Sequence, residues 1–372
     1  MLTSGTMSID PSDTNDGTDH GASQLLARGA ADDVCADRRI VAAIDDFFVD
    51  DQARLDDRVR AALGEALTGL TGVIEAELRQ YAGRLLVGRD DPELANRVIS
   101  DPPCVHLALS RAGLLRDGEL MRELLARVRQ EILGEALAPV APDDPDTPSF
   151  VARLVGDPDG VTATAATALL AADARRRAGI EPGAVPRSDL PAELHHRLVW
   201  WATAAIRLAM PPSPALDRAL TEAALRSLAA HDEGDRLEAA AMRLASALGA
   251  QPHELPGFLI ESLGDRRVAL FVALLAQAMG FSYGLARDIV LDPVADRLWL
   301  VLRALGLDRA AVAAIGLALC EADPRRDVEG FADQLDSILA VSPDAARTAL
   351  ASLSLHPDFR EAILVLAKGQ PR

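Results

Sequence analysis

Apolar and polar positions alternate along most of this chain with the period of an α-helix. In residues 59–70, apolar side chains recur at spacings of three and four, which is the stripe of an amphipathic helix. Residues 78–86 and 117–137 repeat this pattern with leucine as the main apolar residue. No convincing stretch of four or more residues alternates apolar and polar positions beside turn signals. The pattern therefore predicts an all-α fold with strands rare or absent.

Short proline-containing turns interrupt the apolar runs after residue 150. Proline is tolerated in the first turn of a helix, and it pushes the residue before it out of the α region. A neighbouring Asp or Ser can cap the helix that follows. Each of these segments therefore predicts a joint between two helices: 156–160, 210–214, 291–293, 322–324, 341–344 and 355–358.

The spacing of these joints leaves two architectures open. Residues 154–173 have the form of a HEAT-like unit, in which a helix end and an Asp-Pro-Asp turn precede a second apolar helix. Residues 90–99 offer a shorter version. Stacked hairpins of this kind bury apolar faces against their neighbours and leave an extended surface for partners. A multi-helix bundle with tight turns explains the same pattern.

Composition along the chain predicts four regions. Residues 1–37 are expected to be a disordered acidic tail, because the first 22 have too few apolar groups to offset the entropy of ordering. Residues 38–137 form an N-terminal helical region. Residues 138–149 contain four prolines, which cannot continue a helix, and are predicted to be a linker. Residues 150–372 form a C-terminal region of helical hairpins.

Composition and net charge limit the classes of function that the chain can have. The chain has 372 residues, of which 49% are hydrophobic and only 3% aromatic. Alanine, the best helix former, makes up close to a fifth of it. The net charge of −18 argues against broad binding to nucleic acid or to an anionic membrane, since both need a positive field. Arginines 175–177 precede an expected helix end near Gly179, where their positive charge interacts favourably with the negative end of the helix dipole.

The sequence also predicts a soluble, cytoplasmic protein. Residues 1–22 have neither the basic start nor the apolar run of a secretory signal. The longest apolar stretch, 198–210, is shorter than the roughly 20 residues that span a bilayer. The three cysteines are Cys35, Cys104 and Cys320; they are far apart and form no CxxC pair, as expected in a reducing compartment.

Two segments resemble the domain-of-unknown-function 2336 family, whose members are helical bacterial proteins. Residues 188–208 (SDLPAELHHRLVWWATAAIRL) are similar to the family's mid-chain helix with a Trp pair, and residues 264–293 are similar to its later "GD…alF" helix. The likeness covers about residues 85–310. It implies a helical fold and a bacterial cytoplasmic setting. The family has no established activity, so the resemblance assigns no site residue.

Paired aspartates raise one enzymatic alternative. Residues 31–37 and 45–51 each contain Asp-Asp followed by another Asp, and Asp46 and Asp50 would share one face of a helix. Helical enzymes that act on isoprenoid-like diphosphates hold magnesium with aspartates spaced in this way. Such enzymes need two aspartate motifs that face each other across a deep cavity lined by aromatic side chains, whereas these two motifs are nearly adjacent in the sequence. The sequence also has no cluster of basic residues that could bind a diphosphate. Solvated acids, with Phe47 and Phe48 packed inward, are favoured.

The remaining candidates give no catalytic, cofactor or metal residue. His195 and His196 diverge by about 100° on a helix and cannot chelate one metal together. Cys104 and His106 lack a second ligand pair. His253 could begin a phospho-accepting histidine box, but Leu255-Pro256 would break such a helix, so a turn is expected there. No GxSxG, GxxxxGK[ST] or strand-linked GxGxxG motif is present. Single glycines instead stand where helices are expected to end and are explained as C-caps: Gly134, Gly179, Gly249, Gly280 and Gly306.

The tryptophans complete the sequence interpretation. Trp200 and Trp201 either anchor a partner or fill the core of a central helix, and the second is favoured. The leading hypothesis is a non-catalytic interaction or scaffold protein in bacterial regulation, with another protein as partner and without cofactor, nucleic acid or membrane. The alternatives are the magnesium-dependent enzyme and a ligand-sensing helical domain with a pocket near Trp200 and Trp299.

Overall fold

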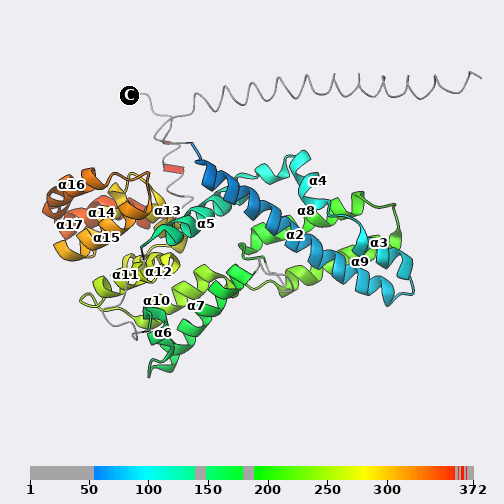
Figure 1. Cartoon of the computed structure of the whole chain (residues 1–372), viewed down its shortest axis with the longest axis horizontal. Helices are drawn as coiled ribbons and strands as arrows, with labels where there is room; N and C mark the ends of the chain where they lie inside the picture. Colours follow the sequence, from blue (N-terminus) through cyan, green and yellow to red (C-terminus); the bar gives the residue numbers. More distant parts are fainter. Residues whose placement is uncertain are drawn as a thin grey trace, which may run out of the picture. The chain divides into compact units, whose positions relative to one another are not determined.

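The computed structural model describes residues 54–138, 148–178 and 188–356, with a few isolated positions between 359 and 366. Within these residues the chain forms sixteen α-helices and three short 3-10 helices, and no strand (Figure 1). The all-α prediction is therefore confirmed. The chain divides into two units, Met1–Asp56 and Asp57–Arg372, and every helix named below belongs to the second. The predicted acidic tail, 1–37, lies outside the described residues.

Eight helices precede residue 231. Aspartate or serine side chains cap α3, α5, α6 and α9, because each accepts a hydrogen bond from a backbone N–H that the first helical turn leaves unpaired. The eight are α2 (Asp57–Val87), α3 (Pro92–Ser100), α4 (Val105–Arg111), α5 (Gly118–Ala136), α6 (Phe150–Val155), α7 (Gly160–Ala178), α8 (Ala192–Leu208) and α9 (Pro214–Ala230).

Eight further helices follow. Four of them are between eight and ten residues long, so their stability depends on packing rather than on helix propensity. They are α10 (Leu237–Leu248), α11 (Leu255–Gly264), α12 (Val268–Met279), α13 (Tyr283–Leu291), α14 (Asp296–Ala304), α15 (Arg309–Ala322), α16 (Val328–Ala340) and α17 (Pro343–Leu350).

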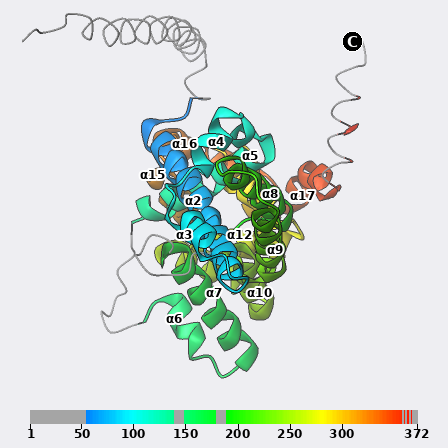
Figure 2. The same cartoon turned by 90° about the vertical axis from the view of Figure 1, so that its right-hand side faces the viewer.

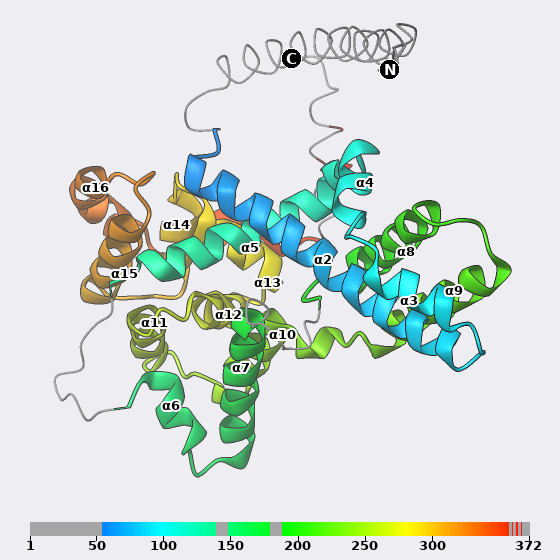
Figure 3. The same cartoon turned by 45° about the vertical axis from the view of Figure 1, so that its right-hand side comes forward.

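Helices from before the predicted linker pack against helices from after it. The long helix α2 contacts α3, α4 and α5, and also α8 and α9 (Figure 3). Helix α5 contacts α12, α13 and α15. Most of the predicted linker, residues 139–147, lies outside the described residues, so the division at 138–149 stays a prediction.

The best-buried helix is α12. Nine of its twelve residues are buried, from Val268 to Ala276, and α5, α10, α11 and α13 surround it. A helix that is apolar on every side is stable only where other elements cover every side. Helix α10 in turn packs against α7, so the core extends from α12 toward α6 and α7 (Figure 2).

A second group of contacts joins the last four helices. Helix α14 packs against α16 and α17, and α15 packs against α11 and α16. Trp299 of α14 lies against Phe331 of α16, with 4.8 Å between ring centroids. Neighbouring helices such as α6–α7 and α8–α9 pair, and distant helices such as α2–α9 and α14–α17 also pair. HEAT-like stacking therefore stays a prediction.

Proline joints and glycine caps mostly occur where the sequence predicts them. The joints at 156–160, 210–214, 291–293, 322–324 and 341–344 all fall at breaks between helices. Gly249, Gly280 and Gly306 have positive φ at or near helix ends, where a side chain would be strained. The expectation for Gly134 is wrong, because Gly134 lies inside α5. A Cβ there would be 3.4 Å from the carbonyl oxygen of Arg266, so this glycine permits close packing.

Helix α8 differs from its prediction as a central helix. Leu208 is 84% exposed, and Trp200 and Trp201 are only half-buried, so one face of α8 is open to water. The indoles therefore do not fill the core. In the described part of the chain, no single helix is long and apolar enough to cross a membrane. The apolar helices α12 and α13 have sufficient length only together, and they meet at an angle of 118°.

Candidate functional site

A hollow of about 470 Å³ lies where α6, the start of α7, the end of α10 and the start of α11 meet. We call it the acidic groove. Its floor contains Phe150, Leu154 and Phe258, and its rim contains Asp157, Asp159 and Glu254. Volumes of this size are typical of sites that hold a small ligand or a few side chains.

The floor of the acidic groove is aromatic. Ser149 caps α6, and the next residue, Phe150, is buried against α11. Phe258 lies in the second turn of α11 and stacks on Phe150, with 5.3 Å between ring centroids and 24° between ring planes. Phe258 is only half-buried, so the aromatic surface is partly open to solvent.

Two of the three rim carboxylates come from the Asp-Pro-Asp turn between α6 and α7. Asp157 accepts a hydrogen bond of 2.8 Å from the backbone N–H of Asp159. Asp159 accepts one of 2.8 Å from the hydroxyl of Thr162 and two of 3.2 Å from backbone N–H groups. These bonds favour the ionised form, and they lower the pKa of Asp159. This aspartate stays charged at neutral pH.

The third carboxylate, Glu254, comes from the turn before α11. Its Oε2 accepts a hydrogen bond of 3.0 Å from the backbone N–H of Gln251. Arg153 also borders the groove, but its guanidinium is paired with Glu261 and lies 5.7 Å from the Phe150 ring. Among the described residues, neither Glu254 nor the two rim aspartates forms an ion pair. The rim is therefore negatively charged without compensation.

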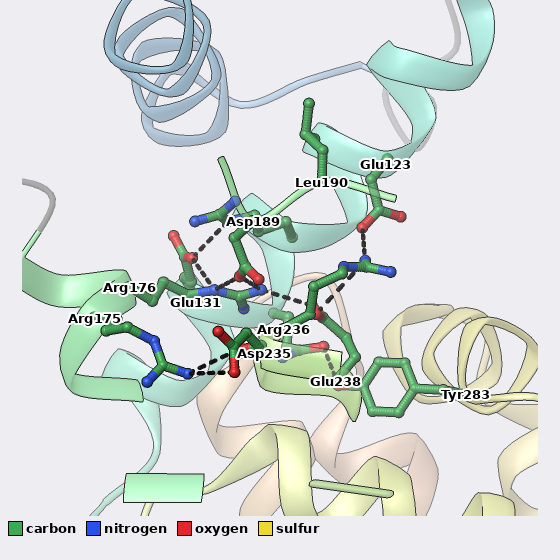
Figure 4. A network of polar contacts seen from close by, with 12 residues as sticks. Glu123, Glu131, Arg175, Arg176, Asp189, Leu190, Asp235, Arg236, Glu238 and Tyr283 are labelled. Carbon is green, nitrogen blue, oxygen red and sulfur yellow. Dashed lines mark hydrogen bonds and ion pairs between the residues drawn. The ribbon is translucent and has the colours of Figure 1, made fainter. Parts of the chain in front are cut away.

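A second polar feature is buried and fully compensated. Arg176 of α7 lies between Asp189 and Glu238, and its Nη2 is 2.7 Å from Glu238 (Figure 4). Arg236 pairs with Glu123 at 3.1 Å, and Arg287 pairs with Glu123 at 2.8 Å. We call these six residues the buried ionic network. It ties α5, α7, α10 and α13 together through their side chains.

The pKa values reflect this compensation. Burial opposes the charge of Glu238, but Arg176 and Arg236 outweigh burial and lower its pKa to about 2. Burial likewise opposes the charge of Arg176, and the facing Glu238 and Asp189 raise its pKa overall. Tyr283 borders the network and donates a hydrogen bond of 3.0 Å to Gln130; burial raises the pKa of its phenol. All these groups keep one protonation state near pH 7.

A smaller hollow of about 290 Å³ opens beside the network, between α5, α8 and α13. Glu123 and Arg287 lie in its wall, and both belong to the network. Arg197 also lines it and pairs with Asp117 at 2.9 Å and with Glu119. Carboxylates therefore already pair with two of its arginines. The charged residues of this hollow have both signs, whereas the unpaired charges of the acidic groove are all negative.

Two histidines come together in a way that the sequence did not predict. His195 of α8 stacks on His231, which follows α9, with 4.1 Å between ring centroids. Burial and the facing His231 lower the pKa of His195 to about 4, so its ring is neutral at pH 7. His231 contacts the carbonyl oxygen of Leu190 at 3.0 Å. His196 points elsewhere and lies at the edge of Trp200, which confirms that the consecutive histidines diverge.

Cys104 and His106 belong to a structural contact between α2 and α4. Glu75 of α2 is buried and accepts hydrogen bonds from the backbone N–H groups of Cys104 and Val105, at 2.9 and 3.0 Å. Arg79 pairs with Glu75 at 2.7 Å and contacts the Cys104 sulfur at 3.3 Å. Burial and Glu75 raise the pKa of the Cys104 thiol. This thiol is protonated at neutral pH, which does not suit a metal ligand or a nucleophile.

The remaining residues that the sequence singled out do not form a site in the described part of the chain. His253 is exposed in the turn before α11, as predicted. Asp45, Asp46 and Asp50 lie outside the described residues, as do Phe47, Phe48 and Cys35. Within the described residues no three His, Cys, Asp or Glu side chains form a group that could hold a metal ion. Trp299 is buried against Phe331, and neither it nor Trp200 lines one of the two hollows.

Sequence reasoning missed both the groove and the network. It interpreted residues 156–160 only as a joint, although the two aspartates there form part of the groove rim. It also assigned Arg176 to the dipole of α7, whereas the structure places Arg176 between buried carboxylates. Phe150 and Phe258 gave a weak signal, since the chain has only eight phenylalanines. Their stacking joins positions 108 residues apart, which no local pattern predicts.

The fold and site define an all-α protein with an open, acid-rimmed groove. The chain belongs to the family described as "Uncharacterised protein conserved in bacteria (DUF2336)", whose model matches residues 132–351, more than half of the chain. The resemblance inferred from the sequence is thereby confirmed. No curated protein and no solved structure matches the chain. The acidic groove lies wholly within the matched residues, whereas the network also uses Glu123, which precedes them.

Proposed function

We propose that this protein is a non-catalytic interaction or scaffold protein in bacterial regulation, that it works in the cytoplasm, and that it binds a protein partner in the acidic groove. One observation carries the proposal. An aromatic floor, partly open to water, is ringed by three carboxylates that have no basic partner among the described residues. Apolar floors with polar rims are the usual anatomy of protein interfaces.

The surroundings of the groove support a protein-sized contact. Val155 and Val161 flank the Asp-Pro-Asp turn and are 39% and 67% exposed. Exposed apolar side chains beside a hollow extend the surface that a partner can cover. Ser149 caps α6, and the floor residues Phe150 and Leu154 of this helix are buried in the core, which fixes the position of the binding surface.

The enzymatic alternative rests on the paired aspartates alone. Asp45, Asp46 and Asp50 lie outside the described residues, so their arrangement stays a prediction. The ligand-sensing alternative has the 290 Å³ hollow as its best location, although two of the arginines there already have carboxylate partners. The acidic groove is the favoured site because its unpaired charges all have the same sign.

Site-specific photo-crosslinking in the native cell tests the proposal. A photoreactive residue replaces Val161 beside the groove, and in a second strain it replaces Leu208 on α8, which is 84% exposed. We expect a discrete protein adduct from position 161, and its loss when Phe258→Ser is added. An adduct of equal yield with Phe258→Ser, or none at position 161, would overturn the proposal. Melting temperatures of the purified variants check that folding is retained.

A further inference from the structure

The partner's chemistry can be inferred from the groove, on the assumption that the proposed function holds. We infer that the acidic groove binds a short amphipathic helix of a partner protein, with a large apolar side chain on the floor and a lysine or arginine about one turn away at the rim. The inference rests on the unmatched rim charge, the aromatic floor and the extent of the exposed apolar surface.

The rim charge selects a cationic group. Asp157 and Glu254 each use one carboxylate oxygen for a local backbone hydrogen bond, which leaves the other oxygen available. Asp159 is held in its ionised form by Thr162 and two backbone N–H groups. Three neighbouring carboxylates repel one another and gain energy from a cation that approaches them. Nucleic acids and anionic lipids are negatively charged, as the rim is, and would be repelled.

The floor selects an apolar side chain beside that cation. The Phe150 and Phe258 rings present a stacked surface, and Phe258 remains half-exposed. Arg153 lies 5.7 Å from the Phe150 ring, so this floor already accepts a guanidinium close to an aromatic ring. An apolar side chain of the partner that covers Phe258 removes apolar surface from water, while a lysine or arginine beside it reaches the carboxylates of the rim.

The surroundings of the groove favour a helix of a partner protein over a small cationic ligand. Val155 and Val161 are exposed and directly adjoin the groove residues Leu154 and Thr162 in the sequence, so a partner longer than one side chain has further apolar side chains available there. On a helix, residues three or four apart share a face. One turn can therefore place an apolar anchor on the floor and a cation at the rim, while the next turn covers the valines. Helix-in-groove binding of this kind is a common mode of peptide recognition.

The test uses the full chain and a defined probe. The probe is a labelled 14-residue synthetic helical peptide with one Phe and two Lys on one face, and its binding is followed by fluorescence anisotropy at low and moderate salt. Two matched peptides replace both Lys by Glu, or Phe by Ser. We expect the Lys peptide to bind most tightly and to weaken as salt rises. Equal binding of the Lys and Glu peptides would overturn the inference.

Matched protein variants locate the site. Asp157→Asn with Glu254→Gln removes two rim charges but keeps an oxygen at each hydrogen-bonded position, and should weaken the Lys peptide by roughly tenfold. The control, Glu321→Gln with Asp333→Asn, removes two exposed charges on α15 and α16 and should leave affinity unchanged. Equal loss in both variants would indicate a general charge effect and overturn the inference.

One outcome separates this inference from the proposed function. A crosslinked partner that depends on Phe258 but binds equally to the rim variant would leave the proposed function standing and overturn the inference.

The chain's own residues 357–372 are also tested as a peptide, because Phe359, Ile363 and Leu366 are exposed and Lys368 is the only lysine of the sequence. Tighter binding of that peptide than of the probe would overturn the assignment to a separate partner.

Discussion

The acidic groove and the buried ionic network contain the same kinds of charged side chain, but these side chains have different roles in the two regions. In the network, Arg176 lies between Asp189 and Glu238, and every charge faces an opposite one in the protein interior. In the groove, Asp157 and Glu254 meet only backbone donors among the described residues, and the floor beside them is partly open to water. A buried charge needs its partner inside the fold, whereas an exposed unmatched charge is available to another molecule.

The strongest test of this comparison measures folding stability, where we expect the largest effect of a substitution. Arg176→Met removes the central cation of the network and leaves Glu238 and Asp189 buried near each other. We expect a loss of about 3–5 kcal/mol in the free energy of unfolding, because a buried charge without its partner is costly. Urea denaturation followed by circular dichroism measures it. A loss below about 1 kcal/mol would show that the network does not hold the helices together.

The next effect is a pH dependence near the network, at the stacked histidines. The pKa of His195 is lowered to about 4 from the usual 6.5, so between these values the unfolded chain binds a proton that the folded chain does not. Stability must therefore fall as pH drops from 6.5 to 4, by up to about 3 kcal/mol from this residue.

The variant His195→Leu checks that prediction. It cannot titrate, so its unfolding free energy should depend less on pH between 6.5 and 4 than that of the wild type. The exposed His253→Gln serves as the control and should keep the wild-type slope. An unchanged slope in His195→Leu would mean that the burial of the histidine pair does not affect its titration.

A smaller effect is expected at the border of the network. Tyr283→Phe removes one hydroxyl that donates to Gln130 at 3.0 Å while the ring and its packing remain. We expect a loss of about 1 kcal/mol, the usual net value of one buried hydrogen bond. Thermal unfolding measures it. No change in melting temperature would place Tyr283 outside the cooperative structure around the network.

The smallest stability effect belongs to the groove. Asp157→Asn with Glu254→Gln relieves repulsion between carboxylates that have no ion pair among the described residues, so the free energy of unfolding should change by less than about 0.5 kcal/mol, with stabilisation favoured. The same urea experiment measures it beside Arg176→Met. A loss comparable to that of Arg176→Met would remove the distinction between the two regions.

The sequence predicted the local features of this fold well. Helical periodicity, proline joints and the glycine caps at Gly249, Gly280 and Gly306 depend on neighbouring residues, and the structure confirms them. It did not predict that α8 has an exposed face or that Gly134 lies inside α5. Both depend on which distant helices pack nearby, and the periodicity of one segment does not contain that information.

The site was harder to predict for the same reason. Phe150 and Phe258, Arg176 and Glu238, and His195 and His231 each meet across long separations in sequence. Each residue alone has an ordinary explanation as core, helix end or turn. Asp157 and Glu254 lie at the rim of one groove only because the helices that they adjoin pack together. This packing comes from burial of apolar surface across the whole unit.

One measurement tests the central claim most directly: the yield of the position-161 crosslink in the variant Asp157→Asn with Glu254→Gln, whose free energy of unfolding serves as the check on folding. The account predicts a stability equal to that of the wild type and a large loss of the crosslinked partner. Wild-type crosslink yield at unchanged stability would contradict it, because the unmatched charges of the groove would then have no role in binding.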